Sequence, residues 1–198
     1  MTSPGPVVVD ACWLDPACPL EPPPGTELGG EAGAGLRLAT TPALGVAGAP
    51  LLGEPLHDAV LTVELGLAEG DDQDLGGLYV RQSTSGRYLA FMVSPTGRVL
   101  VIERDPDRKD AEVLARLDAP LLPTMPFEAG IGGRNRLSLV LAGPALSFYV
   151  NGAPVTPLLV DQRFADGFAG YYLRPGGTSA RCVLDVASTH AVRLFTEP

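Results

Sequence analysis

The sequence is poor in basic side chains and in long apolar runs. Lys and Arg total 14 against 23 Asp and Glu in 198 residues, which gives a formal net charge of −9, and Lys109 is the single lysine. Nucleic-acid binding needs clustered Lys and Arg, and the basic residues here are dispersed, which argues against a nucleic-acid partner. No apolar run approaches the roughly 20 residues of a membrane span, which argues against membrane insertion.

Cysteine and histidine are also scarce, with three and two copies. His57 and His190 lie in unrelated contexts, so the sequence gives no support for a Cys/His zinc site. Cys12 and Cys18 enclose a short loop that a disulfide would stabilise by roughly 2 kcal/mol, and a disulfide and two free thiols stay open as alternatives. Cys182 lies in an apolar run, which predicts a buried, unreactive thiol.

The start of the chain has neither the basic nor the apolar segment that is typical of a signal peptide. Two locations stay open: the cytoplasm, or the cell surface if an export segment has been removed. Hydrophobic residues make up 45% of the chain and charged residues 19%, which is typical of a globular protein. We expect a Pro-rich N-terminal arm over residues 1–27, with one strand at 7–11, and a single domain over residues 28–198.

Short runs of alternating apolar and polar residues fill the expected domain, and Gly and Pro separate them. The expected strands cover residues 36–40, 59–65, 77–82, 88–93, 98–104, 136–141, 146–150, 168–173 and 181–186, with a last edge candidate at 193–195. Residues 107–117 fit both a helix and a strand, and we favour the strand. This pattern predicts an all-β fold, an antiparallel β-sandwich in which two packed sheets form a jelly roll.

Turn chemistry and side-chain alternation support this fold. Ser94-Pro95-Thr96-Gly97 predicts a hairpin between the strands at 88–93 and 98–104. Asn151-Gly152 supplies two positions that tolerate positive φ, as a type I′ hairpin turn requires. The residues that alternation places on the core face are Leu137, Leu139, Leu141, Leu146, Phe148 and Val150. Their outward neighbours are Ser138, Ser147 and Tyr149.

The order of several short motifs resembles the concanavalin A-like lectin/glucanase superfamily. The motifs are Gly133-Arg134-Asn135-Arg136-Leu137, Phe148-Tyr149-Val150-Asn151-Gly152, Asp166-Gly167-Phe168-Ala169-Gly170-Tyr171 and Val183-Leu184-Asp185-Val186. Within the superfamily the sequence is most similar to laminin G-like and DUF1080-like bacterial jelly rolls, over residues 36–192. Because each motif is short and structural, the resemblance concerns the fold more than the activity.

The resemblance implies a non-catalytic module that binds a glycan or another protein. Such modules often bind sugars on the concave sheet, where aromatic rings stack on sugar rings and polar side chains bond to hydroxyl groups. The expected ligand-binding residues are Tyr79, Arg81, Tyr88, Tyr149 and Tyr171. The alternative for each is an ordinary rim or core position, and a cluster of Tyr79, Arg81 and Tyr88 on one exposed face would favour a site.

A glycoside hydrolase is the second function that the resemblance implies, because several lineages with this sandwich are glucanases. Retaining hydrolysis needs two carboxyl groups about 5 to 5.5 Å apart, and the sequence lacks the E-x-D-x-x-E pattern of such enzymes. Glu64 and Glu69 come nearest to it but fall on opposite faces of a regular strand. Glu103 and Asp105 share a face, and we expect them to be solvated at a strand end. Binding is therefore favoured over hydrolysis.

An acidic loop offers a candidate calcium site. Asp71, Asp72 and Asp74 lie between two strands, and Ca²⁺ takes six to eight oxygen ligands, often from such loops. Laminin G-like modules bind calcium at a sandwich edge, and the alternative is an acidic loop tip that keeps the surface soluble. Asp10 and Asp185 form a second, weaker candidate pair.

A structural subunit of a larger assembly is the last alternative. The Pro-rich arm and the stretch at residues 41–55, where Glu54 is the single charged residue, would suit a surface that packs on a partner. The sequence does not separate this role from glycan binding.

Overall fold

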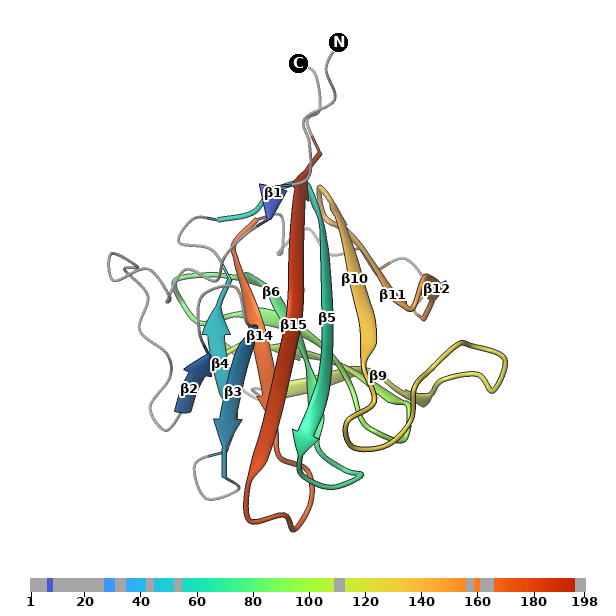
Figure 1. Cartoon of the computed structure of the whole chain (residues 1–198). Coiled ribbons are helices and arrows are strands. Elements are labelled where there is room, and N and C mark those ends of the chain that lie inside the picture. The colour runs from blue at the N-terminus through green and yellow to red at the C-terminus, as the bar shows by residue number, and fades with distance from the viewer. Residues whose placement is uncertain are drawn as a thin grey trace.

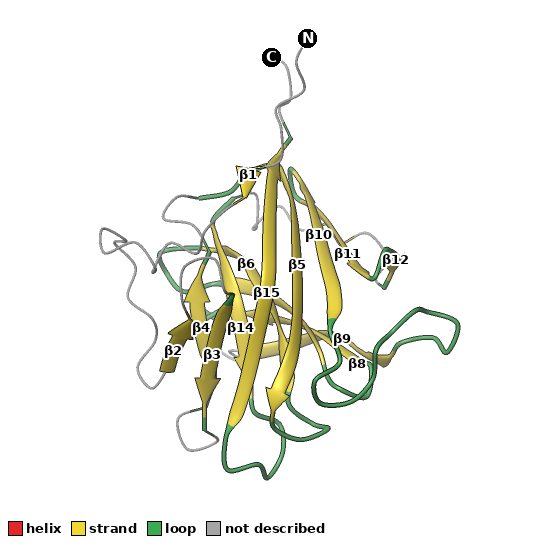
Figure 2. Ribbon diagram, viewed as in Figure 1, coloured by secondary structure: helices red, strands yellow, loops and turns green. Residues whose placement is uncertain are grey.

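The computed structural model of the chain describes residues 7–8, 27–30, 35–41, 45–51, 55–108, 113–155, 159–160 and 166–194. These residues form strands, turns and loops and no helix, so none of them belongs to a helix that could cross a membrane (Figure 2). The prediction of an all-β fold is confirmed.

Two antiparallel sheets pack face to face (Figure 1). Within the described residues, the nine-stranded sheet has the order β12 (Ala153–Pro154), β11 (Ala145–Val150), β10 (Asn135–Ala142), β5 (Ala59–Glu69), β15 (Cys182–Arg193), β3 (Leu36–Thr40) and β2 (Glu27–Gly30), with β1 (Val7–Val8) on β15 and β13 (Leu159–Val160) on β11. The six-stranded sheet has the order β4 (Ala47–Pro50), β14 (Phe168–Arg174), β6 (Leu75–Gln82), β7 (Tyr88–Val93), β8 (Arg98–Arg104) and β9 (Val113–Pro120). The predicted sandwich of two packed sheets is therefore present.

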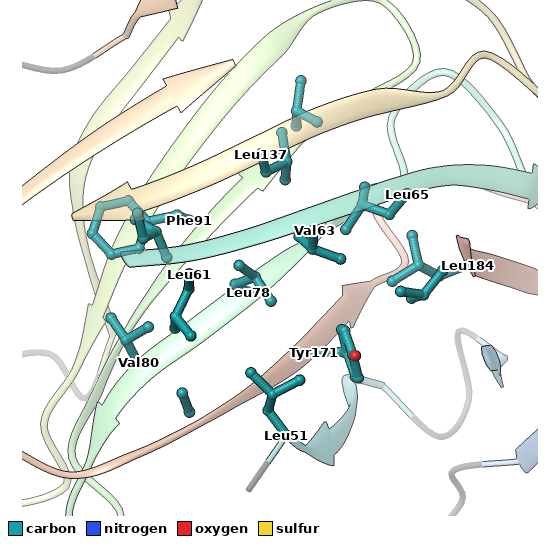
Figure 3. Close-up of a cluster of buried hydrophobic side chains, with 14 of the residues drawn as sticks. Leu51, Leu61, Val63, Leu65, Leu78, Val80, Phe91, Leu137, Tyr171 and Leu184 are labelled. Carbon is teal, nitrogen blue, oxygen red and sulfur yellow. The ribbon is translucent and has the colours of Figure 1, made fainter. Parts of the chain in front are cut away.

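The core lies between the sheets because alternate residues of each strand point inward. Figure 3 shows part of this cluster, in which β5 and β6 contribute side chains from the two sheets. The six residues predicted for the core face of β10 and β11 are all fully buried: Leu137, Leu139, Leu141, Leu146, Phe148 and Val150. The rings of Phe148 and Phe91 meet across the two sheets with their centroids 5.4 Å apart. Full burial of one such side chain stabilises the fold by roughly 1.5–3 kcal/mol.

The two predicted hairpin turns are also present. Asn151 and Gly152 both have positive φ, at 49° and 83°, between β11 and β12, as a type I′ turn requires. In the turn between β7 and β8, the Gly97 N–H donates to the Ser94 carbonyl oxygen at 3.0 Å, and Gly97 has φ 79°. Glycine at this position avoids the strain that a side chain would bring.

Three segments differ from the expectation or extend it. Residues 113–117 belong to strand β9, which confirms the strand alternative from Val113 onward, whereas Asp107 lies in a turn. Arg193 ends β15 and does not begin a separate edge strand, because β15 continues past a register shift between Val186 and Ser188 that interrupts its alternation. Ala47–Pro50, in the stretch expected to form a partner surface, is the buried edge strand β4, whose small residues give little strand signal.

Candidate functional site

The central strands of the six-stranded sheet are buried on both faces. Its inner side chains, such as Leu78 and Phe91, belong to the core between the sheets. A second apolar cluster lies on its outer face and comprises Leu75, Tyr79, Ala90, Met92, Leu100, Ile102 and Tyr172, with the partly buried Tyr88 packed against it. Burial on both faces explains why β6 is an almost continuous run of buried residues. The outer face of this sheet is therefore where an apolar site can form.

Three tyrosines from neighbouring strands meet on this outer face. Tyr172 lies on β14, Tyr79 on β6 and Tyr88 on β7, and these strands are adjacent in the sheet. The ring centroid of Tyr88 lies 6.1 Å from that of Tyr79 and 5.7 Å from that of Tyr172, and both ring pairs are tilted. The hydroxyl oxygens of Tyr88 and Tyr172 lie 3.0 Å apart, within hydrogen-bonding distance. The three rings form one aromatic surface, which we call the tyrosine triad.

A glycine on β14 leaves the space that the triad needs. A Cβ atom added at Gly170 would lie 2.5 Å from the Tyr79 ring and would also meet the Ala49 carbonyl oxygen, which is closer than real side chains approach. Gly167, three residues earlier, has φ 145°, and a Cβ there would lie 2.6 Å from the Arg81 carbonyl carbon. The two glycines of the sequence motif at residues 166–171 therefore serve close packing beside the site.

The triad forms part of the wall of a pocket of about 610 Å³. The described lining residues are Val46, Ala47, Gly48, Pro50, Tyr79, Gln82, Ser83, Thr84, Tyr88, Arg104, Phe168 and Tyr172. The Arg104 guanidinium carbon lies 5.9 Å from the centroid of the Tyr88 ring, a cation–π distance. Gln82, Ser83 and Thr84 add polar groups, and the described lining contains no carboxylate. We call this site the tyrosine pocket.

Burial affects the hydroxyl groups of two members of the triad. It raises the pKa of the Tyr79 and Tyr172 hydroxyls well above their ordinary value, because the interior disfavours a phenolate. Both hydroxyls therefore stay protonated at physiological pH and can donate as well as accept hydrogen bonds.

Of the five predicted ligand-binding residues, the structure brings Tyr79 and Tyr88 to the pocket. Arg81 is not with them. It is a non-glycine residue with φ 58°, it is 1% exposed, and its guanidinium donates to the Leu56 and Gly143 carbonyl oxygens at 3.0 and 2.9 Å. The unusual backbone angle turns this side chain away from the exposed face and makes it a clamp between two loops.

Tyr171 lies in the core between the sheets (Figure 3). Its side chain is 2% exposed, its hydroxyl lies 2.6 Å from the Thr189 hydroxyl, and burial raises its pKa to about 12. Its neighbour Tyr172 points outward instead, because adjacent strand residues face opposite ways. Tyr172, and not the predicted Tyr171, therefore lines the pocket. The buried Ala169 and Leu173 share the parity of Tyr171, and this parity indicates that Tyr171 faces inward.

Tyr149 is partly buried and lies away from the triad. It lies on β11 of the nine-stranded sheet, where it pairs with Ser138 on one side and Pro154 on the other. Alternation along β11 directs it to the outer face of that sheet, as expected from the sequence. The structure therefore separates Tyr149 from the tyrosine pocket by the thickness of the sandwich.

The acidic loop at residues 71–74 is bonded within the protein. The buried Asp74 carboxylate accepts hydrogen bonds from the Gly176 and Asp71 N–H groups and from the Ser179 hydroxyl, each at 2.8 Å. Asp71 accepts from the Gln73 N–H at 2.8 Å and from the Thr178 N–H at 2.7 Å. These bonds join the loop before β6 to the loop before β15.

The same bonds bear on the predicted calcium site. Backbone N–H groups, that of Gln73 first, hold the pKa of Asp71 below its ordinary value. Asp72 is exposed. The described residues contain no group of three or more His, Cys, Asp or Glu side chains placed to hold a metal ion. Because Asp71 and Asp74 already accept hydrogen bonds from both loops, they do not fit a calcium site.

The carboxylates considered for hydrolysis are dispersed. Glu69 pairs with Arg181 at 3.4 Å, whereas Glu64 lies on the outer face of the nine-stranded sheet. The expectation that Glu103 and Asp105 are solvated is wrong. Glu103 is fully buried and pairs with Arg116, because it has the same inward parity on β8 as Val99 and Val101. Asp105 is 4% exposed and pairs with Arg87 at 3.3 Å.

Cys182 is a buried free thiol, as predicted, and burial raises its pKa. Asp185 forms a two-pronged ion pair with Arg37, with nitrogen–oxygen distances of 2.8 and 3.1 Å. Asp10, Cys12 and Cys18 lie outside the described residues.

No protein-family model matches the chain, and no curated protein matches its sequence. Several solved structures do match its fold. The carbohydrate binding module CBM66 from Bacillus subtilis aligns with a TM-score of 0.60 at 10% identity, over 84% of this chain and 91% of that chain. The beta-glucanase of Bacillus licheniformis aligns with a TM-score of 0.59 at 10% identity, over 84% and 82%. The laminarinase catalytic domain from Thermotoga maritima MSB8 gives 0.55 at 9%, over 81% and 70%.

These similarities support the predicted jelly-roll fold, and the concanavalin A-like superfamily stays a prediction. Proteins that share this fold include both a binding module and glycan-cleaving enzymes, so the residues of the site must distinguish these functions.

Proposed function

We propose that this chain is a non-catalytic carbohydrate-binding module and that the glycan binds in the tyrosine pocket. The observation that carries the proposal is the tyrosine triad, which lines a pocket of about 610 Å³ together with Phe168, Arg104 and a short polar stretch. Sugar rings have apolar faces that stack on aromatic rings and hydroxyl groups that need polar partners. The pocket offers both kinds of contact next to each other.

Tyr88 is the central residue of this proposal. It contacts both other rings of the triad, and it is partly buried, whereas Tyr79 and Tyr172 are 7% and 5% exposed. A sugar ring would stack on the accessible part of Tyr88, and the Arg104 guanidinium would donate to hydroxyl groups beside it. Ser83 and Thr84 would bind hydroxyl groups in the pocket.

The similar structures give this proposal its context. One is named as a carbohydrate binding module, and two are named as a glucanase and a laminarinase. A glycan partner is favoured over a protein partner, because protein interfaces are usually broad and this site is a pocket lined by aromatic residues. The narrower placement among laminin G-like and DUF1080-like modules stays a prediction.

Binding to a panel of soluble polysaccharides tests the proposal. For a polysaccharide that binds, Tyr88→Ala should lower the affinity about tenfold or more, because it removes the stacking surface. Tyr88→Leu keeps apolar bulk and should lower affinity as well, and a loss of affinity in a Tyr88→Leu variant that melts at the wild-type temperature does not come from unfolding. Tyr149→Ala is the matched control, a tyrosine on the opposite sheet. Full affinity in both Tyr88 variants would refute the proposal.

Hydrolysis is tested with the same polysaccharides. Glycoside hydrolysis uses two carboxyl groups beside the scissile bond, and we expect no release of reducing ends at high protein concentration. Turnover that Glu64→Gln or Asp185→Asn abolishes would replace binding with hydrolysis as the function.

A further inference from the structure

A second pocket, of about 650 Å³, lies on the outer face of the nine-stranded sheet. Its lining is polar and comprises Thr62, Glu64, Glu128, Arg134, Arg136, Ser138, Asn151 and Gly152. The two sheets pack through their inner faces, so this polar cleft and the tyrosine pocket lie on opposite sides of the sandwich. In the sequence, Glu64 is only an unsuited hydrolase candidate, and no local pattern groups these residues.

Strand register builds the floor of the polar cleft. Glu64 and Thr62 of β5 lie directly opposite Arg136 and Ser138 of β10. The hydroxyl oxygens of Thr62 and Ser138 are 3.1 Å apart. The residues between them, such as Val63, point into the core, so alternation sends this polar set outward.

The wall of the cleft is held by hydrogen bonds. The Asn151 side chain accepts from the Arg136 N–H at 2.7 Å and donates to the Pro126 carbonyl oxygen at 2.9 Å. The Arg134 N–H donates to the Glu128 carboxylate at 3.2 Å. The loop that carries Glu128 and Arg134 is thereby fixed beside the strands, which prepares its side chains for a ligand.

Three charged groups in the cleft have no partner among the described residues. No hydrogen bond or ion pair engages the side chains of Arg134, Arg136 or Glu64 within that part of the chain. A guanidinium can only donate hydrogen bonds, and a carboxylate can only accept them. A ligand that satisfies both must donate and accept at neighbouring positions, as the vicinal hydroxyl groups of a sugar do.

We propose that the polar cleft is a second saccharide site, which binds a neutral sugar through its hydroxyl groups. The two arginines and two glutamates that line the cleft balance in charge, so a neutral ligand fits better than an acidic one. The polar cleft would form hydrogen bonds with the hydroxyl groups at the edge of a sugar ring, whereas the aromatic rings of the tyrosine pocket would stack on the face of a sugar ring. The module would thereby bind two saccharide segments at once, which raises its avidity for a polymer.

Isothermal titration with a neutral glucan hexasaccharide tests this inference, which extends the proposed glycan-binding function. The wild-type chain should bind two hexasaccharides, and Tyr88→Leu should leave one. In the Tyr88→Leu background, Arg136→Gln and Glu64→Gln should each lower the remaining affinity about tenfold, as expected for loss of a charge-assisted hydrogen bond. Arg37→Gln is the matched control, because Arg37 is an exposed arginine of the same sheet that pairs with Asp185 outside the cleft.

The outcomes separate this inference from the proposed function. If the wild-type chain binds a single hexasaccharide and Tyr88→Leu abolishes this binding, the polar cleft is overturned as a site and the tyrosine pocket is supported. A single site that Arg136→Gln weakens, and Tyr88→Leu does not, would support the cleft and overturn the tyrosine pocket. If the cleft binds an oligouronate of the same length more tightly than the neutral hexasaccharide, the proposal of a neutral ligand is overturned. A chain that binds no hexasaccharide would overturn both sites for this ligand class.

Discussion

The side-chain amide of Asn151 donates a hydrogen bond to the Oδ1 atom of Asn135 at 2.8 Å. Asn135 also exchanges two hydrogen bonds of 2.9 Å with the backbone of Glu128. The two asparagines belong to two of the motifs that carry the superfamily resemblance, and together they fix the loop between β9 and β10. The hydrogen bonds of these two asparagines are structural, so their presence in the motifs predicts the loop conformation more than a ligand.

Replacing Asn135 with alanine should destabilise the sandwich. Asn135 is 5% exposed, and its loss leaves the Glu128 N–H and the Asn151 amide without their acceptor. We expect the free energy of unfolding to fall by about 1–3 kcal/mol, measured by urea denaturation. Ser147→Ala, on the outer face of β11, is the control and should change it by less than about 0.5 kcal/mol. Equal stability of the two variants would contradict the assigned role.

Gly170→Ala should disturb the tyrosine pocket from the neighbouring strand. The added methyl group would lie 2.5 Å from the Tyr79 ring, so the ring or the strand must move. Overpacking of this kind costs about 1–3 kcal/mol of stability, and a displaced Tyr79 should also weaken glycan binding. Thermal unfolding and titration of the same samples measure both effects. Unchanged values in both measurements would show that the site tolerates the methyl group.

Asp74→Asn should destabilise the protein by about 2–3 kcal/mol. Both oxygens of the buried Asp74 carboxylate accept hydrogen bonds, whereas a side-chain amide has only one acceptor oxygen. Asp72→Asn, at the exposed neighbour, should have little effect. Added calcium should not change the melting temperature of the wild-type chain, whereas a ligand that binds the native state would raise it. A rise that EDTA reverses and that Asp71→Asn removes would restore the predicted calcium site.

Stability should also fall in acid through Asp71. Its folded pKa lies below its ordinary value because N–H groups of its own loop and of residues 178–179 bond to the carboxylate. The unfolded chain therefore binds a proton first as the pH falls, and the stabilisation is complete above about pH 4 and is lost below it. Urea denaturation between pH 2 and 6 should show this decline, and Asp71→Asn should reduce its slope. An identical slope in the variant would assign the decline to other carboxylates.

The sheets could be predicted from the sequence because period-two alternation and turn residues both report local geometry. β7 and β8 begin and end at the expected residues, and the Asn151-Gly152 turn has the expected backbone angles. β4 was missed because Ala47–Pro50 contains only Ala, Gly and Pro, and its burial depends on pairing with β14, far along the chain. Long-range pairing of this kind leaves no local signal.

The tyrosine pocket could be predicted only in part. Tyr79 and Tyr88 were among the expected ligand-binding residues, and both line the pocket. Tyr171 was expected at the site in place of Tyr172, although Tyr171 shares its inward parity with the buried Ala169 and Leu173, and the register of residues 170–173 is regular. Arg81 departs from the expected alternation of side chains because its φ is positive, and the neighbouring residue types do not predict this angle. The polar cleft needed the register of β5 against β10, which only the folded structure supplies.

The guanidinium of Arg81 reaches two loops that are far apart in the sequence, at Leu56 and at Gly143. A sandwich that assembles with the β10–β11 hairpin shifted would keep this charge buried and lose the acceptor at Gly143. Such a misassembled form would be penalised more heavily than the loss of one contact from the finished fold. Arg81 therefore favours the native arrangement of these two loops over a shifted one.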